Sequence, residues 1–245
     1  MSAAAEVVRF GSPDELASAV ARRAAETLAA AIEARDEAHL AITGGGILEK
    51  VLAALADESV EWPRVYVWWG DERYVPSDSP DRNEIPARRL LLDSVDVDPA
   101  RVHPMPASDA GFPSVEAAAA WYAGELAARA SDGVVPSFDV MLLGVGPDGH
   151  CCSLFPGHPG TQVVDQPVIA VHDSPKPPPT RLSLTFPTLD AAREIWFVAS
   201  GSSKAEAVAH ALSGVDPVHV PSSAPHGQDR TLWLVDEEAA AQLPG

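Results

Sequence analysis

The residues best suited to chemistry lie in one loop, where Asp148 and His150 stand among closely spaced glycines. Gly144, Gly146 and Gly149 allow backbone angles that other residues avoid, so the segment predicts a tight loop at the end of an apolar strand. A neutral imidazole can take a proton from water near pH 7. We therefore expect His150 to act as a general base, with Asp148 orienting either the imidazole or a substrate hydroxyl.

Two other interpretations of this loop are open. Its glycine spacing, Gly-x-Gly-x-x-Gly, matches the dinucleotide-binding fingerprint, which needs a long helix directly after the third glycine. Pro156 comes too soon for such a helix, so no nicotinamide or flavin cofactor is expected. In the second interpretation the loop is only structural: its aspartate caps a helix and its histidine packs.

A second glycine run follows the short apolar segment 39–43 and precedes residues 47–55, whose apolar positions have helical spacing. A strand, a glycine turn and a helix in this order direct backbone N–H groups at an anion. The Gly-Lys-Ser/Thr ending of a P-loop is missing, and a flexible turn is the alternative. We expect a phosphate to contact Thr43, Gly44, Gly45 and Gly46.

Charged and polar residues follow the next apolar segment, 65–69. Arg73 could bind a phosphate through its planar guanidinium. Asp71 could bind a sugar hydroxyl or hold Arg73 in place, and a simple surface salt bridge is the alternative. Asn83, in the same polar stretch, is also expected to contact the substrate.

Cations are few, and the chain has only three lysines. Lys204 follows a Gly-Ser turn at a predicted strand-to-helix junction, where the helix dipole disfavours a cation. A bound anion would offset this, so Lys204 is expected to contact phosphate. Arg181 opens the segment 180–187, whose Leu182, Leu184 and Phe186 alternate as in a half-buried strand.

The elements that must position these residues alternate between two patterns. Strands are predicted at 7–10, 39–43, 65–69, 138–145, 167–171, 180–187, 194–199 and 231–235. Helices are predicted at about 13–34, 47–55, 83–92, 115–130, 187–192 and 205–212, with Trp121 and Leu126 on the apolar side of the fourth. This alternation is typical of an α/β fold: a three-layer α/β/α sandwich with a mostly parallel, Rossmann-like sheet and helices on both faces. We expect one domain, 1–245.

Composition narrows the possible partners. A formal net charge of −18 over 245 residues argues against nucleic acid and anionic membranes. The two cysteines are adjacent, which disfavours a disulfide and favours a reducing compartment. No apolar run reaches the roughly 18 residues of a membrane span, and no export signal is evident. We expect a cytoplasmic monomer or weak dimer.

The motifs together resemble the 6-phosphogluconolactonases, relatives of glucosamine-6-phosphate deaminase. They are ITGGG at 42–46, WWGDERYVP at 68–76, GVGPDGHCCSLFPGHP at 144–159, PPTRLSLTFP at 178–187 and SGSSKAEAV at 200–208. The resemblance implies metal-free hydrolysis of 6-phospho-D-glucono-1,5-lactone to 6-phosphogluconate, the second step of the oxidative pentose phosphate pathway. It implies His150 as the base, and phosphate contacts at the glycine turn, Arg73 and Lys204, with Arg181 close by.

Several differences from the family's motifs leave alternative functions open. The family often has Ser-Thr-Pro after its first glycines, where this chain has Gly46-Ile47-Leu48. Cys151 and Cys152 replace a usual Thr-Ala pair; we interpret them as packing residues, because adjacent cysteines rarely suit a zinc site. Phe155 stands where the deaminases have a catalytic glutamate, which argues against amine loss. A non-catalytic sugar-phosphate sensor is the second rival.

Overall fold

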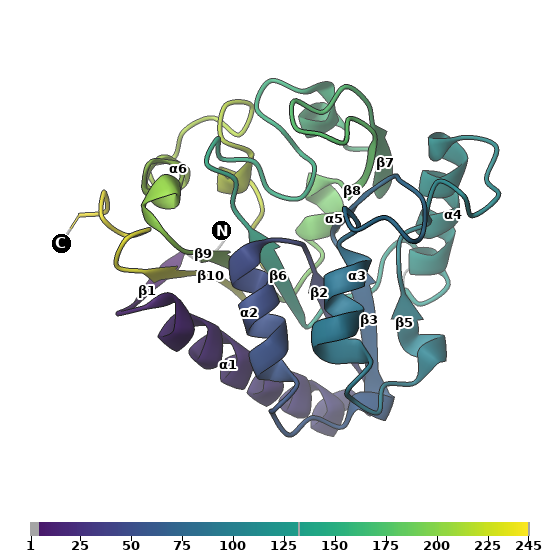
Figure 1. Cartoon of the computed structure of the whole chain (residues 1–245), viewed down its shortest axis with the longest axis horizontal. Coiled ribbons are helices and arrows are strands. Elements are labelled where there is room, and N and C mark those ends of the chain that lie inside the picture. Colours follow the sequence, from purple (N-terminus) through teal and green to yellow (C-terminus); the bar gives the residue numbers. More distant parts are fainter. Residues whose placement is uncertain (1–4, 132, 245) are drawn as a thin grey trace.

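The computed structural model describes residues 5–131 and 133–244, and this part of the chain contains two β-sheets. The larger sheet has seven strands, and every neighbouring pair in it is parallel. In spatial order (Figure 1) they are β1 (Glu6–Phe10), β10 (Arg230–Asp236), β9 (Glu194–Ala199), β6 (Val140–Gly144), β2 (Ala38–Ile42), β3 (Val65–Trp69) and β5 (Val102–His103). Six of them confirm strands that the sequence predicts.

The order of the strands reverses between β6 and β2. From β2 the chain continues to β3 and β5 on one side, whereas from β6 it continues to β9 and β10 on the other. The connections leaving two such strands diverge, and ligands of open α/β sheets bind in the crevice outside the carboxyl ends. The segments that follow β2 and β6 are the two glycine-rich loops, so the fold brings the predicted phosphate turn beside the predicted base.

The described helices are α1 (Pro13–Arg35), α2 (Gly46–Leu55), α3 (Glu84–Ala87), α4 (Val115–Ala127), α5 (Phe186–Leu189) and α6 (Ala205–Leu212). A single turn of π-helix, Arg88–Leu92, continues α3. Helices α1 and α2 lie side by side in front of the sheet (Figure 1). Every residue of β2 and β3 is buried, as expected when helices and loops cover both faces of a parallel sheet. The predicted α/β sandwich is confirmed.

Local sequence explains where α1 begins. Ser12 accepts a hydrogen bond from the N–H of Glu15 at 3.2 Å, and Pro13 occupies the first helical position. Both features are favoured at helix starts, because the first amides lack partners inside the helix and proline has no amide to lose.

The smaller sheet was not predicted. It consists of β4 (Asp71–Arg73), β8 (Arg181–Leu184) and β7 (Val168–Val171), paired antiparallel. From the sequence, residues 71–73 are expected in a loop and the other two strands in the parallel sheet. The difference arises because the proline-rich segment 175–179 turns the chain back on itself between β7 and β8.

Two expectations about exposure were wrong. All four residues of β8 are buried, because the strand lies between β4 and β7, and Phe186 starts α5 instead of extending the alternation. Trp121 is 45% exposed and contacts Phe112, while the buried face of α4 carries Tyr122 and Leu126. No helix in the described ranges has both the length and the apolar character needed to span a bilayer.

Candidate active site

A cavity of about 740 Å³ opens at the carboxyl edge of the sheet, at the reversal between β6 and β2. Ten of the eleven predicted site residues line it: Thr43, Gly44, Gly45, Gly46, Asp71, Arg73, Asn83, His150, Arg181 and Lys204. The eleventh, Asp148, is not part of the lining and lies against His150. Residues from six separate segments of the chain therefore converge on one cavity.

The histidine and the aspartate form a tight pair. Nδ1 of His150 lies 2.5 Å from Oδ1 of Asp148. Burial alone would raise the pKa of Asp148, but the hydrogen bond and charge of His150, together with Lys176, hold the pKa of that carboxyl well below its usual range. An ionised carboxylate can only accept, so Nδ1 carries the proton and Nε2 keeps the free lone pair. The contact between Asp148 and Nδ1 favours the expectation that Asp148 orients the imidazole.

Gly146 makes this pairing possible. A Cβ atom at this position would overlap both the His150 ring and the Asp148 carboxylate. The N–H of Gly146 donates to the carbonyl of His150 at 2.8 Å, which closes the loop. On its other side the imidazole contacts the ring of Phe155, with 4.7 Å between ring centroids. The ring is therefore held between backbone and phenyl, with its Nδ1 edge fixed.

The three glycine amides of this loop are already engaged. Gly144 N–H donates to Oγ1 of Thr43 at 3.1 Å, and Gly149 N–H donates to the carbonyl of Gly146 at 2.9 Å. With the Gly146 amide also paired, the loop's glycine amides have no hydrogen left for a substrate oxygen. The first turn of α2 differs: Glu49 is the first residue of that helix to donate back into the chain, to Gly45. The amides before it remain available to an anion, as at any helix start.

Thr43 has a different part from the one expected. Its hydroxyl donates to the carbonyl of Leu142 at 3.1 Å and accepts from Gly144, so it bridges the ends of β2 and β6. The hydroxyl hydrogen is thus committed to the sheet, and the expected donation from Thr43 to a phosphate is not supported. Thr43 fixes the spacing of the two glycine loops instead.

Asp71 and Asn83 are coupled to each other. Nδ2 of Asn83 donates to the backbone carbonyl of Asp71 at 3.0 Å and to its Oδ1 at 3.3 Å, while Ser153 donates to Oδ2 at 2.7 Å. Arg73 is not an ion-pair partner of Asp71 among the described residues; its Nη1 donates to the carbonyl of Asp81 at 2.5 Å. The alternative that Asp71 holds Arg73 in place is therefore wrong. The Asp71 carboxylate lines the cavity, so the expectation that it binds a sugar hydroxyl remains.

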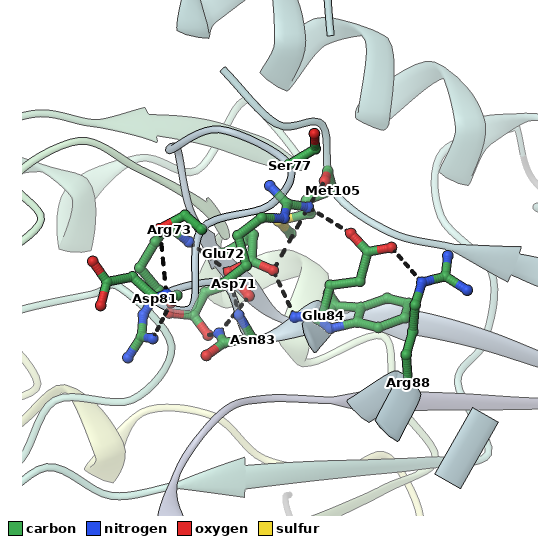
Figure 2. A network of polar contacts seen from close by, with 12 residues as sticks. Asp71, Glu72, Arg73, Ser77, Asp81, Asn83, Glu84, Arg88 and Met105 are labelled. Carbon is green, nitrogen blue, oxygen red and sulfur yellow. Dashed lines mark hydrogen bonds and ion pairs between the residues drawn. The ribbon is translucent and has the colours of Figure 1, made fainter. Parts of the chain in front are cut away.

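Glu72 anchors this region and was not singled out from the sequence. Figure 2 shows its buried carboxylate at the centre of a polar network: Oε1 accepts from the amides of Arg73 at 2.8 Å and Asn83 at 2.7 Å, and Oε2 from the amide of Glu84 at 2.9 Å. Arg82 lies 3.8 Å away and is also buried. The only feature of the sequence that could have pointed to Glu72 is its position between two expected ligands, Asp71 and Arg73.

The cavity is cationic in an acidic protein. All three lysines of the chain line it, and Arg73 and Arg181 lie directly opposite each other in the β4–β8 pair. Like charges opposite each other on neighbouring strands are destabilising. Burial and the nearby Lys176 lower the pKa of Lys204, and burial lowers that of Arg181. This concentration of positive charge suits an anionic ligand.

Arg181 also holds the loop that follows β7. Its Nε donates to the carbonyl of Pro178 at 3.2 Å, and its Nη2 donates to the carbonyls of Lys176 at 3.0 Å and Pro177 at 3.1 Å. Nη1 is the nitrogen left for a ligand. Lys176, which the sequence analysis did not place in the site, reaches the dyad from this loop: its Nζ lies 2.9 Å from Oδ1 of Asp148 and 3.1 Å from Nδ1 of His150.

The two cysteines fit a packing role. Both are free and buried, and burial raises the pKa of each thiol, of Cys152 well above its usual range. The described residues contain no group of three or more His, Cys, Asp or Glu side chains suited to holding a metal ion.

Comparison with known proteins shows the family of the chain. The sequence matches the family of glucosamine-6-phosphate isomerases and 6-phosphogluconolactonases over residues 11–233. A 6-phosphogluconolactonase of Streptomyces coelicolor is 48% identical over 100% of this chain and 97% of its own. The structure of the Trypanosoma brucei 6-phosphogluconolactonase has a TM-score of 0.85 and 28% identity, covering 98% of this chain and 99% of that one. A monomeric glucosamine-6-phosphate deaminase follows at a TM-score of 0.78 and 25% identity, covering 97% and 99%. The chain belongs to the family of glucosamine-6-phosphate isomerases and 6-phosphogluconolactonases.

Proposed function

We propose that this protein hydrolyses 6-phospho-D-glucono-1,5-lactone to 6-phospho-D-gluconate, the second step of the oxidative pentose phosphate pathway. The observation that carries the proposal is the dyad: a histidine fixed through Nδ1 by Asp148, lining a cationic cavity. The 6-phosphogluconolactonases of Streptomyces coelicolor and Mycobacterium tuberculosis match 100% of this chain at 48% and 47% identity, which supports the same substrate.

In the proposed mechanism Nε2 of His150 takes a proton from water as the water oxygen attacks the lactone carbonyl carbon. The carbonyl oxygen gains the electron pair and becomes an oxyanion. The amides of Gly144, Gly146 and Gly149 are engaged within the protein, so we assign stabilisation of this charge to cationic side chains of the cavity. The oxyanion then reforms the carbonyl, the bond to the ring oxygen breaks, and the imidazolium returns its proton to that oxygen.

The phosphate group of the substrate anchors it away from the reacting carbon. We assign the phosphate to the free amides of the glycine turn before α2 and to Arg73, Arg181 and Lys204, which line the same cavity. Binding energy from a remote group positions the carbonyl for attack. Asp71 is assigned to a sugar hydroxyl, and Asn83 to holding Asp71 in place. These groups supply a base and charge stabilisation without a metal ion or cofactor, and we propose that none takes part.

The lactone also hydrolyses spontaneously, so the test is its decay rate with and without the protein. An accelerated decay that saturates with lactone supports the proposal. Decay at the spontaneous rate, with 6-phosphogluconate still binding, would favour the sugar-phosphate sensor. We also propose that the protein acts in the cytoplasm. We propose that it acts as a monomer or weak dimer on a small-molecule substrate.

A second candidate is deamination of glucosamine 6-phosphate, because a deaminase shares the fold at 25% identity. Against it stands Phe155, whose ring packs on His150 and under the guanidinium of Arg181. The position that would need a carboxylate beside the imidazole is apolar and fully buried. Ammonia release from glucosamine 6-phosphate would decide for this candidate.

A further inference from the structure

Lys176 contacts both members of the dyad from a separate part of the chain. Its Nζ lies 2.9 Å from Oδ1 of Asp148 and 3.1 Å from Nδ1 of His150. We propose that Lys176 is a positioning residue that makes the dyad a triad: it shares the aspartate oxygen with the imidazole and weakens the hold of the protein on the imidazolium. This inference rests on the proposed function, in which His150 must both take and return a proton.

The loop that carries Lys176 is fixed by its own hydrogen bonds. Oγ of Ser174 donates to the carbonyl of Lys176 at 2.9 Å and accepts from its amide at 3.3 Å. The buried Arg181 donates to the same carbonyl at 3.0 Å and to the carbonyl of Pro177 at 3.1 Å. The same guanidinium also donates to the carbonyl of Pro178, so it binds three consecutive carbonyls. The lysine stem therefore starts from a backbone that is anchored to the small sheet.

The contacts assign a role to each donor. Nδ1 of His150 carries a proton, because it lies 2.5 Å from an ionised carboxylate oxygen. It has no lone pair for the ammonium, so the Lys176–His150 contact is a charge beside a ring and not a hydrogen bond. The ammonium donates to Oδ1 of Asp148, the same oxygen that accepts from the imidazole. One oxygen with two donors fixes the position of both.

The ammonium of Lys176 affects the charged form of the His150 ring. Asp148 stabilises an imidazolium, whereas an ammonium at this distance opposes it. With Lys176 beside the imidazolium, return of the proton to the leaving ring oxygen becomes easier than with the aspartate alone. The other charged groups that line the cavity are Lys50, Asp71, Arg73, Arg181 and Lys204.

The test is the pH dependence of kcat/KM for lactone hydrolysis, corrected for spontaneous decay. In Lys176→Met the acid limb should move up by about one pH unit, the low end of the range for a charge next to a titrating group, because Lys176 is partly exposed. KM should stay within about twofold, and Lys176→Arg should restore most of the native profile. Melting temperatures of all variants establish that they are folded.

Arg22→Met is the matched control. Arg22 is exposed on α1 and is not among the residues that line the cavity. The substitution removes the same charge without touching the dyad, and its acid limb should coincide with the native one. An unmoved acid limb in Lys176→Met with a raised KM would make Lys176 a substrate ligand and overturn the inference. An equal shift in both variants would reduce the effect to net charge and also overturn it.

Failure of the proposed function is seen separately, as no acceleration of lactone decay by the native chain. The inference then still has a readout in ¹⁵N NMR of the imidazoles, with the His150 signals assigned by their loss in His150→Gln. The ring of His150 should become protonated at higher pH in Lys176→Met than in the native chain. Coincident titrations would contradict the inference whatever the substrate.

Discussion

At the residue scale, the proposed mechanism depends on one histidine whose two nitrogens have separate tasks. Asp148 occupies Nδ1 at 2.5 Å, which leaves Nε2 for the chemistry. The sequence predicted both residues from their place after a strand and among glycines. It could not predict Lys176, because that contact spans 26 residues and depends on how a proline-rich loop folds back. Nor could it predict that the hydroxyl of Thr43 is used within the sheet.

Gly146→Ala tests the dyad without removing either member. The new Cβ would overlap the His150 ring and the Asp148 carboxylate, so one of them has to move. Misplacing a reacting group by about 1 Å can cost about 10²-fold, and we expect kcat to fall by at least that factor while KM changes little. Steady-state kinetics at pH 7.5 measure both.

Gly124→Ala is the matched control for this substitution. A Cβ at Gly124, within α4, meets no atom within 4 Å. This variant should keep native kinetics and gain about 0.5–1 kcal/mol of stability, because alanine is favoured over glycine inside a helix. A native kcat in Gly146→Ala would show that the ring position does not matter.

At the element scale, the parallel strands were predictable and the small sheet was not. Apolar segments of strand length between glycine turns and helical segments gave six of the seven strands in the larger sheet. Strands β4, β7 and β8 are three or four residues long. Strand β4 pairs with β8 across more than 100 positions of chain, so no local pattern encodes that pairing, whereas β7 and β8 are close in sequence. Yet β4 and β8 bring Arg73 and Arg181 together. Much of the cationic cavity therefore depends on pairing that local sequence does not reveal.

Glu72→Gln tests the network that fixes the segment after β4 (Figure 2). Glutamine keeps one acceptor oxygen but presents an NH₂ group toward a backbone amide, which leaves a buried donor unpaired. It also removes the negative charge beside the buried Arg82. We expect a loss of about 1–3 kcal/mol in the free energy of unfolding, measured by urea titration.

The control for Glu72→Gln is Glu33→Gln, at an exposed position of α1. Its effect on unfolding should stay within about 0.5 kcal/mol. Equal stabilities for the two variants would mean that the Glu72 carboxylate contributes nothing to the fold.

A stack of aromatic rings across β2, β3 and β5 predicts how stability depends on pH. His39 stacks on Tyr66 and accepts a hydrogen bond from Nε1 of Trp68 at 3.1 Å through Nδ1. Burial lowers the pKa of His39 to about 4, outweighing the neighbouring Glu37. The folded state therefore resists a proton that the unfolded chain accepts below about pH 6.5.

Acid should thus destabilise the fold through this histidine. Stability is unaffected by His39 above pH 6.5, falls as the pH drops below it, and levels off near pH 4. Between pH 7.5 and 5 we expect this residue to account for a loss of about 2 kcal/mol. Urea unfolding at both values should show a smaller drop in His39→Gln, whose amide oxygen can still accept from Trp68. Equal drops would assign the pH dependence to other groups.

At the scale of the whole molecule, charge is distributed unevenly. The chain has a formal net charge of −18, yet its three lysines all line one cavity with two arginines. Segments far apart in the chain contribute to that cavity, and the reversal of strand order between β2 and β6 sets its place. The carboxyl ends of parallel strands share an edge, which brings the glycine loops after β2 and β6 together. The fold thus places all three lysines where an acidic protein can bind an anion.

The most direct test compares lactone hydrolysis by the native chain and by His150→Ala, with His172→Ala as control because His172 pairs with Glu116 away from the cavity. Loss of a general base should lower kcat by about 10²–10⁴-fold, with KM nearly unchanged because the phosphate contacts remain. His172→Ala should match the native chain. A native kcat in His150→Ala would contradict the account, since no other residue is given the proton of the attacking water.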